Sequence, residues 1–144
     1  MVKNEINNLK KVSQGHKNIL KLVDYFETVN NCYLVTEYAY GGKLFDRIVS
    51  KDSYPEYDVV NLVRNITDAV AYLHDGIVHR NLKSENILFR TCDENYDIII
   101  IGFHFSCIID DSETPEIFKK SGCGKPRSFD IELWDGISDL GKIS

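Results

Sequence analysis

Apolar residues recur at helical spacing in two stretches of the chain. In residues 2–13 they fall every three or four positions with lysine and asparagine between them, which predicts an amphipathic helix that ends at Gly15. Pro55 suits the first turn of a second, longer helix that continues to about His74. The broad apolar stripe of this second helix is typical of a helix buried in the centre of a domain.

Shorter apolar runs predict strands. Residues 19–27 and 32–38 are rich in β-branched and aromatic residues, and Asn30-Asn31 between them predicts a hairpin-type turn. Residues 97–101 form a compact apolar strand. A short helix is expected over 43–49.

The pattern changes toward the C-terminus. Residues 110–130 carry acidic and then basic side chains, so we expect mostly irregular chain there. Residues 131–143 can form a final helix, although Gly136 and Gly141 disfavour one.

Length and composition fit a single soluble domain with its own core, since the chain has 144 residues, of which 43% are hydrophobic and 27% charged. The net charge of −5 argues against bulk binding to nucleic acid or to an anionic membrane. No apolar run reaches the roughly 18 residues of a membrane span, and the N-terminus lacks a signal peptide's apolar core. The four cysteines show no C-x-x-C spacing, so we expect free thiols and a cytoplasmic location, with a nuclear one left open.

The segment from Ile77 to Leu88 carries the clearest functional pattern. It reads I-V-H-R-N-L-K-S-E-N-I-L and resembles the catalytic loop of protein kinases, H-R-D-L-x-x-x-N between short apolar strands. Asn81 stands where the family has the aspartate that accepts the proton of the substrate hydroxyl. An amide has no titratable carboxylate and cannot act as a general base near neutral pH.

Other motifs follow in the kinase order. Residues 41–48, G-G-K-L-F-D-R-I, resemble the G-G-E-L-F-D-R-I of calcium/calmodulin-dependent Ser/Thr kinases. Residues 121–126 resemble the S-G-C-G-T-P of an activation segment, and 135–141 resemble the D-x-W-S-L-G that follows it. The resemblance implies an α+β, protein kinase-like fold. Residues 1–38 would form a partial N-lobe of one helix and two antiparallel strands, and 39–144 the hinge and an incomplete, mainly helical C-lobe.

The same resemblance implies roles for residues around a nucleotide. Glu5 matches the glutamate that holds the phosphate-binding lysine. Thr36 matches the gatekeeper, and the run from Glu37 through Tyr38 to Ala39 matches the hinge that reads adenine through its backbone. Leu88 would form the floor beneath adenine.

Further roles are implied for the catalytic loop and the core. Lys83 matches the lysine near the transferred phosphate, and Asn86 matches the second metal ligand. Each role has a plainer alternative, such as a solvated helix charge for Glu5. The positions of the apolar stack that ties the two kinase lobes together are occupied by Leu9, Leu22, His79 and Phe103.

Departures from the kinase pattern concern the chemistry itself. Gly102 in I-I-G-F-H takes the place of the aspartate in x-x-D-F-G, and glycine offers no side-chain oxygen to magnesium. The printed sequence starts after the positions of the Gly-rich loop and the V-A-I-K lysine, so we expect neither. The resemblance implies ATP and magnesium as cofactors, but these losses, with Asn81, predict that none is bound. Lys83 and Asn86 leave weak, metal-independent nucleotide contact open.

Three interpretations stay open. The favoured one is an inactive kinase-like module that binds a protein partner, with no nucleic-acid or membrane partner and an unknown oligomeric state. The second is a fragment of an ATP-dependent Ser/Thr kinase that phosphorylates proteins. The third, a decayed sequence without a stable product, is opposed by the intact apolar patterning.

Overall fold

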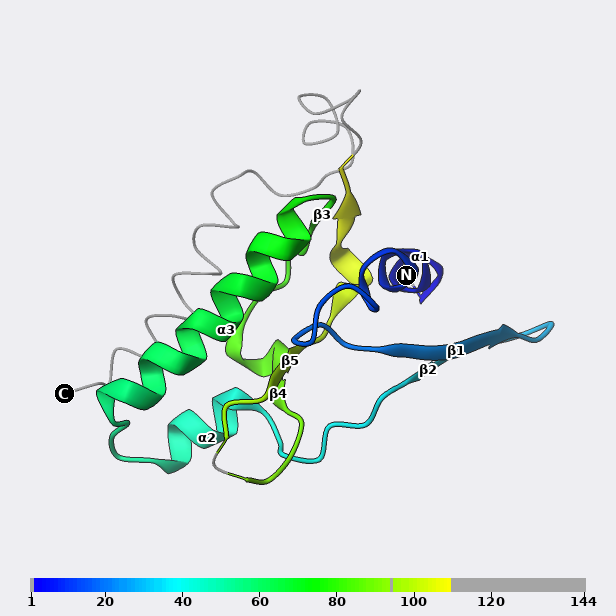
Figure 1. Cartoon of the computed structure of the whole chain (residues 1–144). Helices are drawn as coiled ribbons and strands as arrows, with labels where there is room; N and C mark the ends of the chain where they lie inside the picture. The colour runs from blue at the N-terminus through cyan, green and yellow to red at the C-terminus, as the bar shows by residue number, and fades with distance from the viewer. Residues whose placement is uncertain (1, 94, 110–144) are drawn as a thin grey trace.

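A computed structural model describes residues 2–93 and 95–109 of the chain (Figure 1). The expectations for 110–130 and 131–143 lie outside these residues, as do the motifs at 121–126 and 135–141. The elements, in chain order, are α1 (Val2–Val12), β1 (Leu22–Glu27), β2 (Cys32–Thr36), α2 (Leu44–Ser50), α3 (Glu56–His74), β3 (Ile77–Val78), the 3-10 turn η1 (Ser84–Asn86), β4 (Ile87–Phe89), β5 (Ile98–Ile100), the 3-10 turn η2 (Phe103–Phe105) and β6 (Cys107–Ile108).

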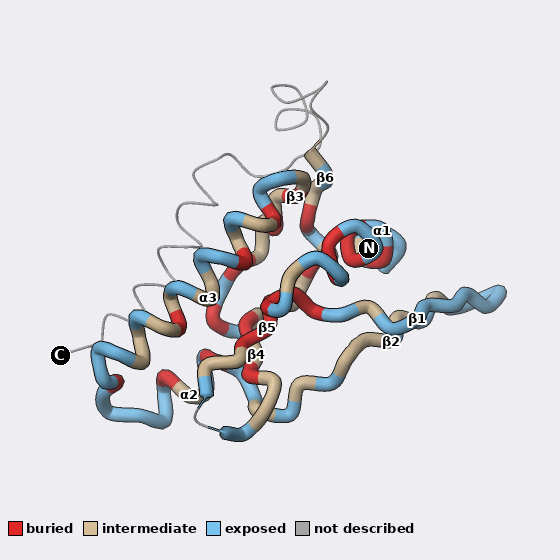
Figure 2. Tube along the Cα trace, in the orientation of Figure 1, coloured by how far each residue is buried: buried red, intermediate tan, exposed pale blue. Residues whose placement is uncertain are grey.

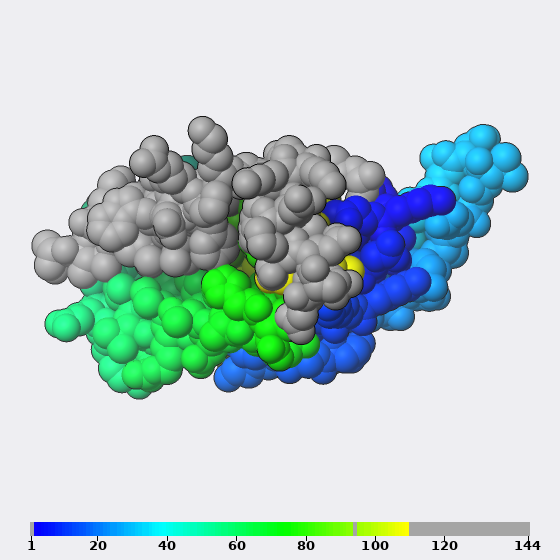
Figure 3. Space-filling view, turned by 90° about the horizontal axis from the view of Figure 1, so that it is seen from above, coloured from blue at the N-terminus to red at the C-terminus, as the bar shows by residue number. Residues whose placement is uncertain are grey.

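The strands pair in three separate two-stranded antiparallel sheets: β1 with β2, β3 with β6, and β4 with β5. The β1–β2 hairpin extends away from the helices (Figure 1), and its light-blue tip projects beyond the body in the space-filling view (Figure 3). Phe26 and Tyr33 face each other across this hairpin and stack with ring centroids 4.7 Å apart. This cross-strand aromatic contact stabilises a ribbon that has little other burial.

Strand β5 lies at the centre of the core. Its three isoleucines are fully buried, because α3 packs against β5 and β4 pairs with it. The chain at Ile19 also joins β5 through a parallel bridge to Ile100, so the predicted strand over 19–27 begins as core and becomes regular strand only from Leu22 (Figure 2). The fully buried apolar side chains of the described residues are Leu9, Ile19, Leu44, Leu62, Ala69, Leu73, Ile77, Phe89, Ile98, Ile99, Ile100 and Phe103.

Helix α1 is attached to η2 by asparagine side chains. The Asn8 amide is 1% exposed, and its Nδ2 donates to the carbonyls of Phe103 and Ser106 at 3.2 and 3.0 Å. Asn4 Nδ2 donates to the carbonyls of His104 and Ser106, both at 3.0 Å. The sequence pattern places these asparagines among the polar positions of an amphipathic helix, but the structure uses them to bind irregular backbone that has no sheet partner.

The predicted helices over 2–13, 43–49 and 55–74 are confirmed to within a residue or two at their ends, as is the strand at 97–101. Cys32 and Cys92 are free thiols, and the Cys107 sulfur accepts a hydrogen bond from Arg80 Nη1 at 2.8 Å. Among the helices in the described ranges, none is both long enough and apolar enough to cross a membrane.

Two residues on α3 test how the core depends on this helix. Leu62 is fully buried, whereas Val60, two positions earlier, is 46% exposed. Leu62→Ala should lower the free energy of unfolding by about 2–5 kcal/mol, because it leaves a cavity in a close-packed core. Urea denaturation followed by circular dichroism measures the change. Val60→Ala is the matched control and should change stability by less than about 0.5 kcal/mol; equal effects would show that α3 does not pack as described.

Candidate functional site

The β4–β5 pair brings three of the predicted site residues together. β4 begins directly after Asn86, and β5 ends two residues before Gly102. The Ile101 N–H donates to the Asn86 carbonyl at 2.9 Å, which holds the two segments side by side. The Asn86 side chain donates from Nδ2 to the Asn81 carbonyl at 2.7 Å. Asn81, Asn86 and Gly102 therefore share one corner of the molecule.

Gly102 adopts a backbone conformation that suits glycine. Its φ of +84° is in the left-handed region, which L-residues with a side chain rarely adopt. A Cβ placed on Gly102 would lie 3.0 Å from both Cγ and Nδ2 of Asn86. The amide of Asn86 therefore fills the space into which a side chain at position 102 would project.

This corner does not fit a magnesium ion. Magnesium requires nearly octahedral oxygen coordination, usually with one or two carboxylates. Asn81 and Asn86 supply amides and Gly102 supplies no side chain. Within residues 2–93 and 95–109, no three His, Cys, Asp or Glu side chains gather in a way that could hold a metal.

Asn81 is held by two histidine side chains. Its backbone N–H donates to Nδ1 of His79 at 3.2 Å, and its side-chain Nδ2 lies 3.5 Å from Nε2 of His104. The amide can hold a position in the loop, but it has no lone pair basic enough to accept a substrate proton. Lys83 is exposed, in extended backbone just before η1.

His79 is buried and neutral. Its side chain is 2% exposed, and its Nε2 lies 2.9 Å from the Ile101 carbonyl. Because the Asn81 N–H can only donate and the Ile101 carbonyl can only accept, the proton of the neutral ring is on Nε2. Burial lowers the pKa of His79 to about 4. The hydrogen bond to the Ile101 carbonyl raises the pKa but does not offset burial, and the nearby His104 lowers it slightly further.

The predicted apolar stack lies in or against one core. Leu9 and Phe103 are fully buried, and Leu22 is partly buried against the same cluster. The edge of one ring faces the other in the His79–Phe103 pair, with centroids 4.8 Å apart. The histidine ring therefore packs as an aromatic core residue while its two nitrogens fix the loop.

The residues predicted to contact adenine lie along a segment beside β4. The Gly41 N–H donates to the Phe89 carbonyl at 3.0 Å, and Lys43 forms a bridge to Leu88. Ala39 and Leu88 are both partly buried against the core. The Thr36 hydroxyl donates to the Glu37 carbonyl at 3.1 Å. Glu5 lies half-buried on α1, the helix that packs against η2 directly after Gly102.

Glu37 has a structural partner that sequence reasoning missed. Arg90 contacts its carboxylate through Nε at 3.0 Å and Nη2 at 3.3 Å, and the Lys21 N–H donates to it at 2.9 Å. Burial raises the pKa of Glu37, but these hydrogen bonds outweigh burial and leave the pKa below its ordinary value. Arg90 also pairs with Asp97 and donates to the Lys17 carbonyl at 2.8 Å. No local pattern marks the contacts of Arg90 with Glu37 and Lys17, because these two partners are distant in the sequence.

Comparison with known proteins places the chain among protein kinases. The family model of the protein kinase domain matches residues 1–127, and the chain belongs to the protein kinase family. It is 55% identical to calcium/calmodulin-dependent protein kinase cmkB of Emericella nidulans over 93% of this chain and 36% of that protein. It is 50% identical to calcium/calmodulin-dependent protein kinase type I of Schizosaccharomyces pombe, covering 92% of this chain and 43% of that one.

A third relative is myosin light chain kinase A of Dictyostelium discoideum, 43% identical over 87% of this chain and 41% of the relative. The chain thus spans less than half the length of each of these relatives. Its fold is a partial protein kinase-like fold, similar to Ser/Thr kinases of the calcium/calmodulin-dependent type.

Gly102 and Gly42 form a matched pair for testing the crowded corner. Both have positive φ, +84° and +80°, but a Cβ on Gly42 would meet nothing within 4 Å. Gly42→Ala should cost about 1–2 kcal/mol of unfolding free energy from backbone strain alone. Gly102→Ala should cost about 1 kcal/mol more, because the new methyl group presses on the Asn86 amide. Thermal or urea denaturation measures both.

A double-mutant cycle with Asn86→Ala isolates that contact. Removing the amide should make Gly102→Ala less costly than it is in the wild type. If Gly102→Ala lowers the free energy of unfolding no more than Gly42→Ala does, the Asn86 side chain does not fill the space beside position 102.

The buried His79 predicts a dependence of stability on pH. Its pKa is about 4 in the folded chain and 6.5 for an ordinary histidine. Below pH 6.5 the unfolded chain therefore takes up a proton that the folded chain refuses. The contribution of neutral His79 to the free energy of unfolding is fully present above pH 6.5. It decreases by roughly 3 kcal/mol as the pH falls to about 4.

Urea unfolding at a series of pH values tests this, with His79→Gln as the comparison. The free energy of unfolding of the variant should decline less steeply than that of the wild type between about pH 6.5 and pH 4. His16, whose pKa is also lowered by burial, supplies part of the remaining slope. An unchanged slope in His79→Gln would contradict a buried neutral His79.

Proposed function

We propose that this chain is a catalytically inactive protein kinase-like domain that acts by binding a protein partner, in the cytoplasm. The observation that carries the proposal is the corner formed by Asn81, Asn86 and Gly102. There the positions of a general base and of a metal-binding aspartate hold an amide and a left-handed glycine, and a second amide, that of Asn86, fills the space beside the glycine.

The chemistry of phosphotransfer explains why these changes matter together. Kinases work by positioning a magnesium nucleotide and stabilising the charge on the transferred group. Loss of a general base alone typically slows such a step by about 10²–10⁴-fold. Without the carboxylate at position 102, the cation that neutralises the phosphates also loses a main ligand.

The second candidate is a fragment of an active Ser/Thr kinase that phosphorylates proteins. The observation that favours it is the retained framework: His79, Phe103 and the segment beside β4 are all packed. The relatives are named as calcium/calmodulin-dependent kinases, so in this case ATP, magnesium and regulation by calmodulin would apply to the protein that contains the fragment.

A phosphotransfer assay tests whether the wild-type chain is inactive. With ATP labelled on its γ-phosphate, magnesium and a serine-containing peptide, the wild-type chain should transfer no phosphate above a no-enzyme control. An intact calcium/calmodulin-dependent kinase, which should turn over at about 1–100 s⁻¹, serves as the positive control. Asn81→Asp combined with Gly102→Asp shows whether these two positions account for the loss.

Nucleotide binding is measured in parallel by the shift in melting temperature on adding ATP. We expect no shift that depends on magnesium, since the corner lacks carboxylates. Robust transfer by the wild type, or a magnesium-dependent shift, would favour the active-kinase candidate instead.

A further inference from the structure

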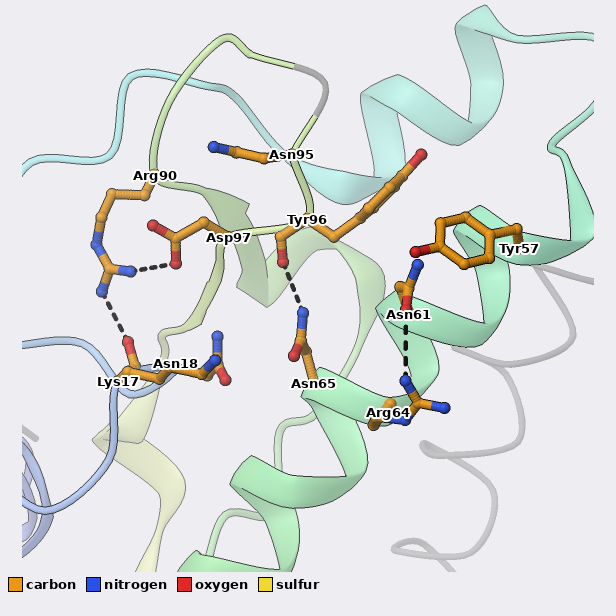
Figure 4. Close-up of a pocket in the computed structure, with 10 residues that line it drawn as sticks. All are labelled: Lys17, Asn18, Tyr57, Asn61, Arg64, Asn65, Arg90, Asn95, Tyr96 and Asp97. Carbon is orange, nitrogen blue, oxygen red and sulfur yellow. Dashed lines mark hydrogen bonds and ion pairs between the residues drawn. The ribbon is translucent and has the colours of Figure 1, made fainter.

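A cavity of about 660 Å³ lies outside the catalytic-loop corner, between α3, the turn at Lys17-Asn18 and the chain from Arg90 to Asp97. Figure 4 shows Tyr57, Asn61, Arg64 and Asn65 along one side, all from α3, with Lys17, Asn18 and Arg90 across from them. None of the kinase-like site residues lines this cavity. The cavity is therefore separate from the kinase-like site.

Positive charge predominates in the walls of the cavity. The cations Lys17, Arg64 and Arg90 line it, against the single carboxylate of Asp97. The charge of Arg90 is engaged by Glu37 and Asp97. In residues 2–93 and 95–109, neither Lys17 nor Arg64 forms an ion pair, so these two charges are available to a ligand. A local basic site on a chain of net charge −5 selects for anionic groups close to it.

The amides of the cavity add hydrogen-bond donors. Asn61 accepts from Arg64 Nη1 at 3.5 Å and Asn95 accepts from the Thr91 hydroxyl at 3.4 Å, both through Oδ1. Their Nδ2 groups are left to donate. Together with Lys17 and Arg64 they form a donor-rich lining, which suits the oxygens of a carboxylate.

Asn18 supplies an unmatched acceptor in the same wall. It is 1% exposed, and its Nδ2 donates to the Ile98 carbonyl at 2.7 Å. Its Oδ1 has no hydrogen-bond partner among the described residues. A buried amide oxygen without a donor costs free energy, and the N–H of a bound peptide is a donor of the right kind. A fully deprotonated anion such as sulfate would not offer one.

We propose that this cavity binds an acidic peptide segment of a partner protein. Carboxylate side chains of the peptide contact Lys17 and Arg64, and a backbone N–H of the peptide faces the Asn18 amide oxygen. The exposed Tyr57 ring covers part of the segment. Two free cations are too few for a nucleic-acid backbone, which binds by neutralising many phosphates. The proposal names the partner chemistry for the interaction role proposed above and rests on that role.

Fluorescence anisotropy with a labelled octapeptide of alternating glutamate and glycine tests the site on the full chain. The lysine–glycine octapeptide of the same length is the ligand control. We expect binding of the glutamate peptide, weakening as salt is added, and no binding of the lysine peptide. The double variant Lys17→Gln with Arg64→Gln should bind at least about tenfold more weakly, since both charge-assisted contacts are lost.

The matched control is Lys10→Gln with Lys11→Gln, which removes the same charge from the exposed side of α1. It should bind the glutamate peptide as the wild type does. Chemical shifts of the Asn61 and Asn65 side-chain amides, measured by NMR during the titration, locate the peptide independently of any variant. Equal weakening in both double variants, a preference for the lysine peptide, or unmoved asparagine amides would each overturn the proposal.

The two proposals fail separately. Phosphate transfer by the wild type would overturn the inactive function and leave the peptide affinity of the cavity unaltered. A failure of the glutamate peptide to bind would overturn the cavity proposal. The phosphotransfer assay would still decide whether the chain is catalytically inactive.

Discussion

The burial of strand β5 is the constraint on which the rest of the structure depends. Three consecutive fully buried isoleucines must be covered on both faces and paired on both edges, since unpaired backbone groups in the core are costly. α3 covers them, β4 pairs on one edge, and the chain at 18–20 exchanges backbone hydrogen bonds with Ile100 on the other. Because β5 is fixed, the position of Gly102, two residues later, is fixed as well.

The polar contacts near β5 divide into two groups with different consequences. Around Asn81 and Gly102 the partners are amides, carbonyls and a neutral histidine ring. Around Arg90 they are charged, and one guanidinium joins Glu37, Asp97 and the Lys17 carbonyl. The charged group therefore serves to tie separate segments of the chain together. At the corner that corresponds to a kinase active site, the described residues Asn81, Asn86 and Gly102 carry no carboxylate.

Sequence reasoning located the elements whose signals are local. The period of α1 and α3 and the isoleucine run of β5 predict their structures because packing follows that period. The kinase motifs indicated the corner at Asn81, Asn86 and Gly102. The burial of Asn8 and the partners of Arg90 could not be found in this way, since each depends on residues far along the chain: Asn8 bonds residues 103 and 106, and Arg90 bonds Glu37.

The nature of the bonds at Asn81 explains how a kinase-like loop can carry asparagine at this position and keep its shape. Asn81 is held through its own backbone N–H and carbonyl, to His79 and Asn86. Asparagine and aspartate have nearly the same size, so these backbone bonds do not distinguish them. The exchange removes a proton acceptor and leaves the packing of His79 against Phe103 unaffected. The backbone hydrogen bonds of this loop therefore form with either asparagine or aspartate at position 81.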